Sequence, residues 1–218
     1  MIVAGKCPPE KKELEETEKK GFENIELFIE RKHLDSMDKT LKNLRESSLK
    51  TVSVHTPHVT LEEDEYLKKA DRLAEELNAY LVFHTGKYVH SEYEQVEELD
   101  FKSEHGYENQ PGASIRCLEN CVLNRDHELV LDVAHLYIAE ENYLERTKYL
   151  LENYQEKIEL IHMCDSTEIN DGIAFGEGDL DTEELSKLIK SNFNGIVVLE
   201  VMPEDQEEAL KKWQSYQT

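Results

Sequence analysis

The sequence contains few of the residues that interrupt, cross-link or anchor a chain. Among its 218 residues are 5 prolines, 9 glycines, 4 cysteines and 1 tryptophan. So little proline and glycine leaves no low-complexity linker, and no apolar run approaches the roughly 18 residues of a membrane span. No signal-peptide pattern opens the chain. We therefore expect a single cytoplasmic domain over residues 1–218, with no membrane partner.

The cysteines lack the spacing of the common metal and disulfide motifs. Cys7, Cys117, Cys121 and Cys164 include no C-x-x-C pair. Cys117 and Cys121 are four residues apart, which in a helix suits a packing face better than a zinc knuckle. Reduced thiols in the core are the expected state in a cytosolic chain.

Positive charge is also scarce. The chain has 25 Lys and Arg against 48 Asp and Glu, a formal net charge of −23. In stretches such as 11–20 and 64–78 the acidic residues alternate with lysine, which is typical of solvated helix faces. A field of this sign repels polyanions, so extended nucleic-acid binding is disfavoured.

Short apolar segments alternate with charged, amphipathic ones along the whole chain. Strands are expected near residues 2–5, 24–30, 51–55, 80–84, 128–132, 157–162 and 195–200, with a weak strand entering a loop at 105–112. Helices are expected near residues 10–20, 36–46, 64–78, 114–123, 141–156 and 205–216, with another beginning near 181 and a short one within 91–103. Eight strand–helix units predict an α/β fold, a single (β/α)8 TIM barrel with its site at the C-terminal strand ends. An open doubly wound sheet is the alternative.

Ionisable residues gather where these strands end. Asp132 ends one strand and His135 follows three residues later, so the two share a site only if the chain turns directly after Asp132. A buried carboxylate needs a cation or a donor beside it. Residues of the same kinds stand at or just beyond seven strand ends: Glu30, His55, His84, Glu108, Asp132, His162 and Glu200. Such a mixed set of histidines and carboxylates is what zinc, manganese or cobalt selects.

These motifs resemble those of the xylose isomerase-like barrel superfamily, which includes sugar isomerases, epimerases and the endonuclease IV family of abasic-site nucleases. Glu108 lies in a Glu-Asn-Gln-Pro-Gly loop that looks like the loop of the family's bridging glutamate. Asp132 with His135 matches its Asp-x-x-His signature, and His162 and Glu200 match its strand-seven histidine and strand-eight glutamate. The resemblance implies that four of these residues bind a divalent metal: Glu108, Asp132, His162 and Glu200.

His55 and His84 match two further histidines, which complete a second metal position in the nucleases. The nucleases build a third position from the histidine matching His135 and an Asp-x-His pair. Here the corresponding places are occupied by residues 170 and 172, or by 171 and 173, and neither register offers a histidine. The resemblance therefore implies one or two divalent ions (Zn, Mn or Co) per chain and leaves His135 to contact the substrate.

Three functions remain open. The first is a metal-dependent isomerase or epimerase of a sugar or sugar phosphate, working by proton transfer through a metal-stabilised enediolate. Glu108 and Glu200 are its candidate bases, and His135 would bind a hydroxyl or the developing oxyanion. The second is an endonuclease IV-like phosphodiesterase or AP endonuclease with two metals bridged by Glu108. The third is a barrel that keeps the metal site but acts in binding or regulation. The expected partner is a small carbohydrate or sugar phosphate, and superfamily members often form homodimers.

Other residues have secondary roles in these hypotheses. If the substrate is phosphorylated, amides near Gly176–Gly178 would bind the phosphate, especially if the next helix points its N-terminus there. His58 and Lys87 follow ligand-bearing strands within reach of a substrate, and Glu30 is expected to orient a ligand or substrate at the barrel mouth. The position of segment 91–103 allows it to act as a lid. Solvation is expected for the remaining histidines, His33, His90, His105 and His127, and packing for Trp213 and Tyr216.

Overall fold

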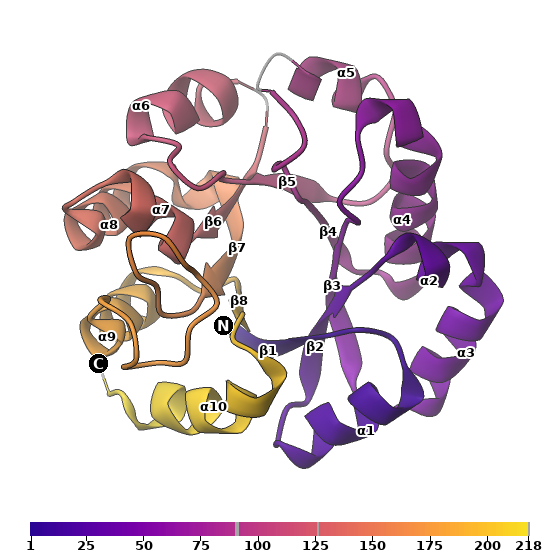
Figure 1. The fold of residues 1–218 in the computed structure, drawn as a ribbon. Helices are drawn as coiled ribbons and strands as arrows, with labels where there is room; N and C mark the ends of the chain where they lie inside the picture. The colour runs from indigo at the N-terminus through magenta and orange to yellow at the C-terminus, as the bar shows by residue number, and fades with distance from the viewer. Residues whose placement is uncertain (90–91, 126, 218) are drawn as a thin grey trace. The chain divides into compact units, whose positions relative to one another are not determined.

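The computed structural model describes residues 1–89, 92–125 and 127–217. Eight parallel strands follow one another in chain order and form a closed barrel, with helices between them (Figure 1). The strands are β1 (Ile2–Cys7), β2 (Asn24–Phe28), β3 (Lys50–His55), β4 (Tyr80–Phe83), β5 (His105–Glu108), β6 (Leu129–Asp132), β7 (Ile158–Met163) and β8 (Ile196–Leu199). The predicted (β/α)8 barrel is confirmed, and the open doubly wound sheet is wrong.

Most of the connections between strands are helical. The α-helices are α1 (Lys11–Lys19), α2 (Arg31–Asp35), α3 (Met37–Glu46), α4 (Asp64–Leu77), α5 (Tyr93–Glu97), α6 (Ile115–Leu118), α7 (Val133–Ala139), α8 (Tyr143–Tyr154), α9 (Thr182–Asn192) and α10 (Gln206–Ser215). Short 3-10 helices are η1 (Leu61–Glu63), η4 (Gln155–Lys157) and η5 (Pro203–Asp205), and η3 (Glu119–Leu123) is a π-helix. Within the described residues, no helix is both long and apolar enough to cross a membrane.

The chain divides into two compact units. Unit 1 comprises Met1–Gly5 and Asn109–Thr218, and unit 2 comprises Lys6–Glu108. In unit 2, β2, β3, β4 and β5 pair in parallel in that order. In unit 1, β6 pairs with β7, β7 with β8, and β8 with the first residues of β1, so the start of the chain lies beside its last strand (Figure 1).

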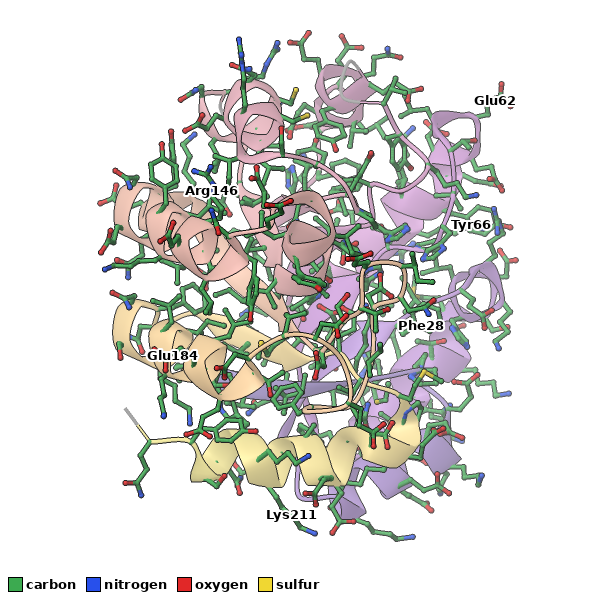
Figure 2. All side chains as sticks on the ribbon, turned by 60° about the vertical axis from the view of Figure 1, so that its left-hand side comes forward. Phe28, Glu62, Tyr66, Arg146, Glu184 and Lys211 are labelled. Atoms are coloured by element: carbon green, nitrogen blue, oxygen red, sulfur yellow. The ribbon has the colours of Figure 1, made fainter. Side chains whose placement is uncertain are left out.

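The elements form where the apolar pattern permits burial. The four residues of β6 and of β8 are all buried, as expected for parallel strands covered on both faces. Helix α4 buries an apolar stripe on one side and ends at Asn78, which takes the left-handed conformation (φ 50°) that asparagine tolerates. Charged side chains project outward from the other helices, Arg146, Glu184 and Lys211 among them (Figure 2).

The elements differ from the sequence expectation at three places. Strand β2 ends at Phe28 rather than near residue 30, and it is followed by a five-residue helix, α2, that was not predicted. The expected helix 114–123 is a single α-turn, α6, that continues as a π-helix. Helix α7 was not predicted, because Val133–Ala139 has no polar face to create an amphipathic period. This helix supplies the turn after Asp132 that the sequence argument required.

Candidate metal-binding clusters

Unit 2 brings together three of the predicted ligands. His55 ends β3, His84 follows β4, and Glu108 ends β5, so the parallel order of the strands places all three at one edge of the sheet. Glu108 Oε2 lies 2.9 Å from His84 Nδ1 and 3.5 Å from His55 Nε2. His55 and Glu108 are buried, and His84 is 20% exposed. We call these three residues the unit 2 cluster.

The hydrogen bonds of His55 favour a cation in this cluster. His55 Nδ1 lies 3.1 Å from the carbonyl oxygen of Thr56, which can only accept, so Nδ1 carries the proton. Burial, and then the charge of Lys6, lower the pKa of His55, which keeps the ring neutral. Its Nε2 lone pair therefore faces a carboxylate oxygen of Glu108, and two acceptors directed at the same space suit a metal ion. A backbone carbonyl orienting a ligating histidine in this way is a common feature of metal sites.

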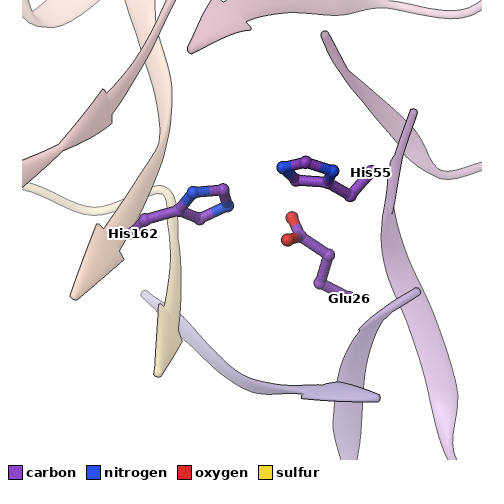
Figure 3. Close-up of side chains that lie close together, drawn as sticks. All are labelled: Glu26, His55 and His162. Carbon is purple, nitrogen blue, oxygen red and sulfur yellow. The ribbon is translucent and has the colours of Figure 1, made fainter. Parts of the chain in front are cut away.

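A further carboxylate that the sequence argument missed lies beside His55. Glu26 in β2 is fully buried, accepts a hydrogen bond from Ser53 Oγ (2.9 Å) and lies 3.4 Å from Lys6 Nζ. Glu26 and His55 offer neighbouring ligand atoms (Figure 3). The sequence argument named Glu30 because it assumed a longer strand. Strand β2 ends at Phe28, so Glu26 lies within the strand, whereas Glu30 lies beyond it at the start of α2.

Unit 1 brings together the other three ligands, Asp132, His162 and Glu200. His162 Nδ1 lies 2.8 Å from Glu200 Oε2 and 3.9 Å from Asp132 Oδ2. His162 is fully buried, Asp132 is 2% exposed, and Glu200 is 27% exposed. These residues end β6, lie near the end of β7 and follow β8, which are consecutive strands. We call them the unit 1 cluster.

Asp132 has a second task in the same unit. Its Oδ1 accepts the backbone N–H of His135 (2.8 Å) and so caps helix α7. The other oxygen, Oδ2, faces His162. The side-chain amide of Asn109 holds the strand end in place, because it donates to the carbonyl of Asp132 (2.9 Å) and accepts from its N–H (2.7 Å). One carboxylate thus begins a helix and offers a ligand oxygen.

Both ring nitrogens of His135 lie close to oxygen atoms of the protein, so its surroundings are not formed by a substrate alone. Its Nδ1 lies 2.7 Å from the carbonyl oxygen of Asn109, and its Nε2 lies 3.1 Å from Asp171 Oδ2. The hydrogen bond with His135 lowers the pKa of Asp171. The sequence argument mentioned residue 171 only in asking whether a histidine of the nucleases' third metal position is present. Its contact with His135 depends on the tertiary structure and cannot be read from the spacing of the two residues.

The Gly176–Gly178 loop does not offer a phosphate site. The backbone N–H groups of Gly176 and Gly178 donate to Asp165 Oδ2 at 2.8 and 2.9 Å, and the N–H of Leu180 donates to Oδ1 at 3.0 Å. Asp165 is fully buried, and its Oδ1 also accepts the N–H of Ser166. The amides expected to bind a substrate phosphate are already bonded to a carboxylate, so that expectation was wrong.

The structure changes the expectations for three other residues, Glu30, His33 and His127. Glu30 is exposed, precedes α2 and lies 2.5 Å from Lys32 Nζ, so it belongs to a helix start rather than to a cluster. His33 is buried; its ring accepts the N–H of Glu30 and forms a hydrogen bond with the Glu10 carboxylate. His127 is buried as well. Their expected solvation was therefore wrong.

The described part of segment 91–103, whose position in the sequence allows a lid, is packed against other residues of unit 2. Tyr93 stacks on Tyr107 with ring centroids 4.4 Å apart, and Val96 is buried. The carboxylate of Asp71 accepts the backbone N–H groups of Lys102 and Ser103. These contacts anchor both ends of the described part, while residues 90 and 91, which include the expected start of the segment, lie outside the described residues.

The two residues expected near a substrate differ in their surroundings. His58 stacks on His84 with ring centroids 3.8 Å apart and planes 6° apart, and burial together with His84 and His55 lowers its pKa to about 4. It therefore presents a neutral, partly exposed ring beside the unit 2 cluster. Lys87 is exposed. Trp213 is buried as expected.

The chain was compared with protein-family models and with solved structures. A family model described as xylose isomerase-like TIM barrel matches residues 14–216. A protein from Thermus thermophilus that was soaked with ZnCl2 has a TM-score of 0.73 and 20% identity, over 99% of this chain and 98% of that chain. A xylose isomerase domain protein from Alicyclobacillus acidocaldarius has a TM-score of 0.68 and 15% identity, over 98% of each chain.

At these identities the solved structures establish the fold alone. No curated protein matched the chain. The family model, however, spans nearly all of the sequence, including every residue of both clusters. The chain therefore belongs to the xylose isomerase-like TIM-barrel family.

Proposed function

We propose that the protein is a divalent-metal-dependent isomerase or epimerase that acts on a sugar or sugar phosphate. The observation that carries this proposal is that each unit gathers three ligands of the histidine and carboxylate type at strand ends. Three protein ligands with a remaining open position are the usual arrangement of catalytic zinc, and manganese or cobalt accept the same donor types. We therefore expect one or two ions per chain.

The residues present fit such ions. In the unit 2 cluster a neutral imidazole lone pair faces a buried carboxylate, and in the unit 1 cluster Asp132 and Glu200 place two carboxylates around one buried imidazole. Leaving these charges buried without a cation is costly. A bound divalent ion would polarise a carbonyl and the hydroxyl on the next carbon of the substrate.

The chain's own groups supply the proton transfer. Glu108 and Glu200 are the candidate bases, since each presents a carboxylate oxygen beside the ligand imidazoles at a strand end. His135 is held through Nδ1 by the carbonyl of Asn109, so its Nε2 edge is directed toward Asp171 and a substrate hydroxyl. We propose that His135 positions that hydroxyl while a proton moves between adjacent carbons.

A metal-dependent phosphodiesterase of the endonuclease IV type is the second candidate. The observation in its favour is the unit 2 cluster, because His55 and His84 provide ligands for a second ion. The charge of −23 opposes it, since it repels a polyanionic substrate.

The first test is the metal content of protein purified without added metal or chelator. We expect zinc, manganese or cobalt in the wild type and about one equivalent less in His84→Ala. His105→Gln is the matched control, because His105 lies at the opposite end of β5 from Glu108 and should leave the content unchanged. Metal-replete protein would then be assayed on ketose and aldose panels, followed by phosphodiesters. Protein that takes up no metal on titration would contradict both enzyme functions and favour a binding role.

A further inference from the structure

Glu26 is a buried carboxylate beside the unit 2 cluster, and two other side chains of unit 2 hold it. It lies in β2, is fully buried, and offers a ligand atom within 4.8 Å of one offered by His55 (Figure 3). Its Oε2 accepts a hydrogen bond from Ser53 Oγ at 2.9 Å, and its Oε1 lies 3.4 Å from Lys6 Nζ. Glu26 is therefore near enough to His55 to share an ion with it, yet its carboxylate is already paired within the protein.

Lys6 is an unexpected neighbour for a cluster that would bind a cation. Its side chain is 11% exposed, so water screens its charge little. Burial, and then the charge of Lys6, lower the pKa of His55, which means that the ammonium group acts on the unit 2 cluster. A like charge weakens the binding of a divalent ion, so the position of Lys6 has a cost for metal binding. The ion pair with Glu26 is the contact that can offset this cost.

Removal of Lys6 would leave the carboxylate of Glu26 as an uncompensated charge in the interior. Such a group either takes up a proton or pairs with another cation. An ion held by the unit 2 cluster would be such a cation, because it would lie beside His55. Lys6 and the ion therefore compete for Glu26.

The outcome of this competition decides how many protein ligands the ion has. His55, His84 and Glu108 supply three. A fourth ligand from Glu26 would complete a tetrahedral zinc site, which is the closed arrangement of structural zinc. Catalytic zinc instead keeps three protein ligands and one position for water or substrate.

We propose that Lys6 is a positioning residue that withholds Glu26 from the ion of the unit 2 cluster and so keeps one coordination position open. Ser53 assists, because it stands opposite Glu26 in the register of β2 and β3 and holds the second carboxylate oxygen. This inference rests on the proposed metal-dependent function and adds to it a residue outside both clusters.

The first test is zinc affinity, measured by competition with a chromophoric chelator. The whole chain carries His162→Ala, so that bound zinc reports on the unit 2 cluster, and this reference is compared with the same protein carrying Lys6→Met. We expect Lys6→Met to bind zinc about tenfold or more tightly, an effect of the size that residues next to metal ligands have.

The second test detects the open position in the same proteins loaded with cobalt. Imidazole is the probe, because it is largely neutral at about pH 8 and its binding does not respond directly to the charges of Lys6 and Glu26. It should change the visible absorption of cobalt in the reference. It should leave the absorption of the Lys6→Met protein unchanged, because Glu26 then fills the position.

Two further variants serve as controls. Lys6→Met combined with Glu26→Gln replaces both members of the buried pair by uncharged groups of similar size, so it should fold even where Lys6→Met alone does not. This double variant should regain the imidazole response and the zinc affinity of the reference. Lys50→Met removes an exposed lysine at the opposite end of β3 from His55 and should change zinc affinity by less than about twofold.

Tighter zinc binding by Lys6→Met with the imidazole response retained would show that Lys6 acts through its charge alone, and would overturn the inference. An unchanged affinity would do the same. So would a double variant that loses zinc, since Glu26 would then be a ligand even beside Lys6. A reference that binds neither zinc nor cobalt, while the wild type binds one of them, refutes the inference and leaves the proposed function standing. A wild type that binds neither contradicts the proposed function itself.

Discussion

The fully buried side chain of Asp165 fixes the loop after β7 by accepting four backbone hydrogen bonds. Gly178 is required for this contact, since a Cβ there would lie 2.4 Å from Asp165 Oδ1 and 2.5 Å from the carbonyl of Ser166. A side chain at 178 would therefore displace the carboxylate from its donors.

We expect Asp165→Asn to lower the free energy of unfolding by about 3 kcal/mol. The amide nitrogen of asparagine would face the N–H groups of Gly176 or Gly178, leaving donors unpaired in a buried place. Urea denaturation of metal-free protein measures the change. Asp179→Asn, an exposed acid in the same loop, should cost less than about 0.5 kcal/mol. Similar values for the two variants would show that the buried hydrogen bonds do not stabilise the fold.

The depressed pKa of His58 predicts how the metal-free protein responds to acid. Burial, then the neighbouring His84 and His55, lower its pKa to about 4, whereas the unfolded chain has a value of about 6.5. Between these two pH values the unfolded state binds a proton that the folded state does not, so stability falls as the pH drops from about 6.5 to 4. His58→Asn should lose less stability over this interval. The titration of the His58 ring in NMR spectra checks the premise, and a pKa of 6 or above would contradict it.

At the scale of single elements, Asp132 joins the end of β6 to the beginning of α7. Its Oδ1 caps the helix, and its Oδ2 belongs to the unit 1 cluster. The two tasks can be separated, because asparagine also caps helices well but is a neutral and weaker metal ligand.

In metal-free protein we therefore expect Asp132→Asn to be more stable than Asp132→Ala by about 1 kcal/mol, the typical value of an N-cap. Both variants should bind less metal than the wild type. Chemical denaturation after dialysis against chelator, together with metal analysis, gives the two quantities. If the alanine variant matches the asparagine variant in stability, the cap does not contribute to α7.

Elements with a clear local sequence pattern were predictable, whereas short or irregular elements and tertiary contacts were not. The strands were predictable because buried β-branched runs such as Ile196–Leu199 are distinctive, and all six cluster residues stand within a residue of a strand end. Helix α2 has only five residues, and the π-turn η3 has no known sequence signal, so neither could be derived. Which backbone N–H groups of the Gly176–Gly178 loop are already hydrogen-bonded depends on Asp165, whose position is set by the tertiary structure.

The charge of the whole molecule bears on the metal clusters as well as on the substrate. A net charge of −23 raises the local concentration of cations and disfavours phosphorylated ligands. Inside each unit the effect is stronger, because buried carboxylates such as Asp132 and Glu108 are only 2% and 3% exposed to water that could screen them.

Metal removal should therefore destabilise the entire fold. An ion that binds only the folded state at 100 times its dissociation constant adds about 2.7 kcal/mol, which for a chain of this size corresponds to a shift in Tm of about 5–10 °C. We expect chelator to lower Tm by this amount and added zinc, manganese or cobalt to restore it. Magnesium is the control ion, because it prefers octahedral oxygen ligands and suits these imidazole-containing clusters poorly. Double substitution of His84 and His162 by alanine should abolish the response to the transition metals. An unchanged Tm, in protein from which the chelator is shown to have removed the metal, would mean that the ions do not bind the folded chain in preference to the unfolded one and therefore do not occupy these clusters.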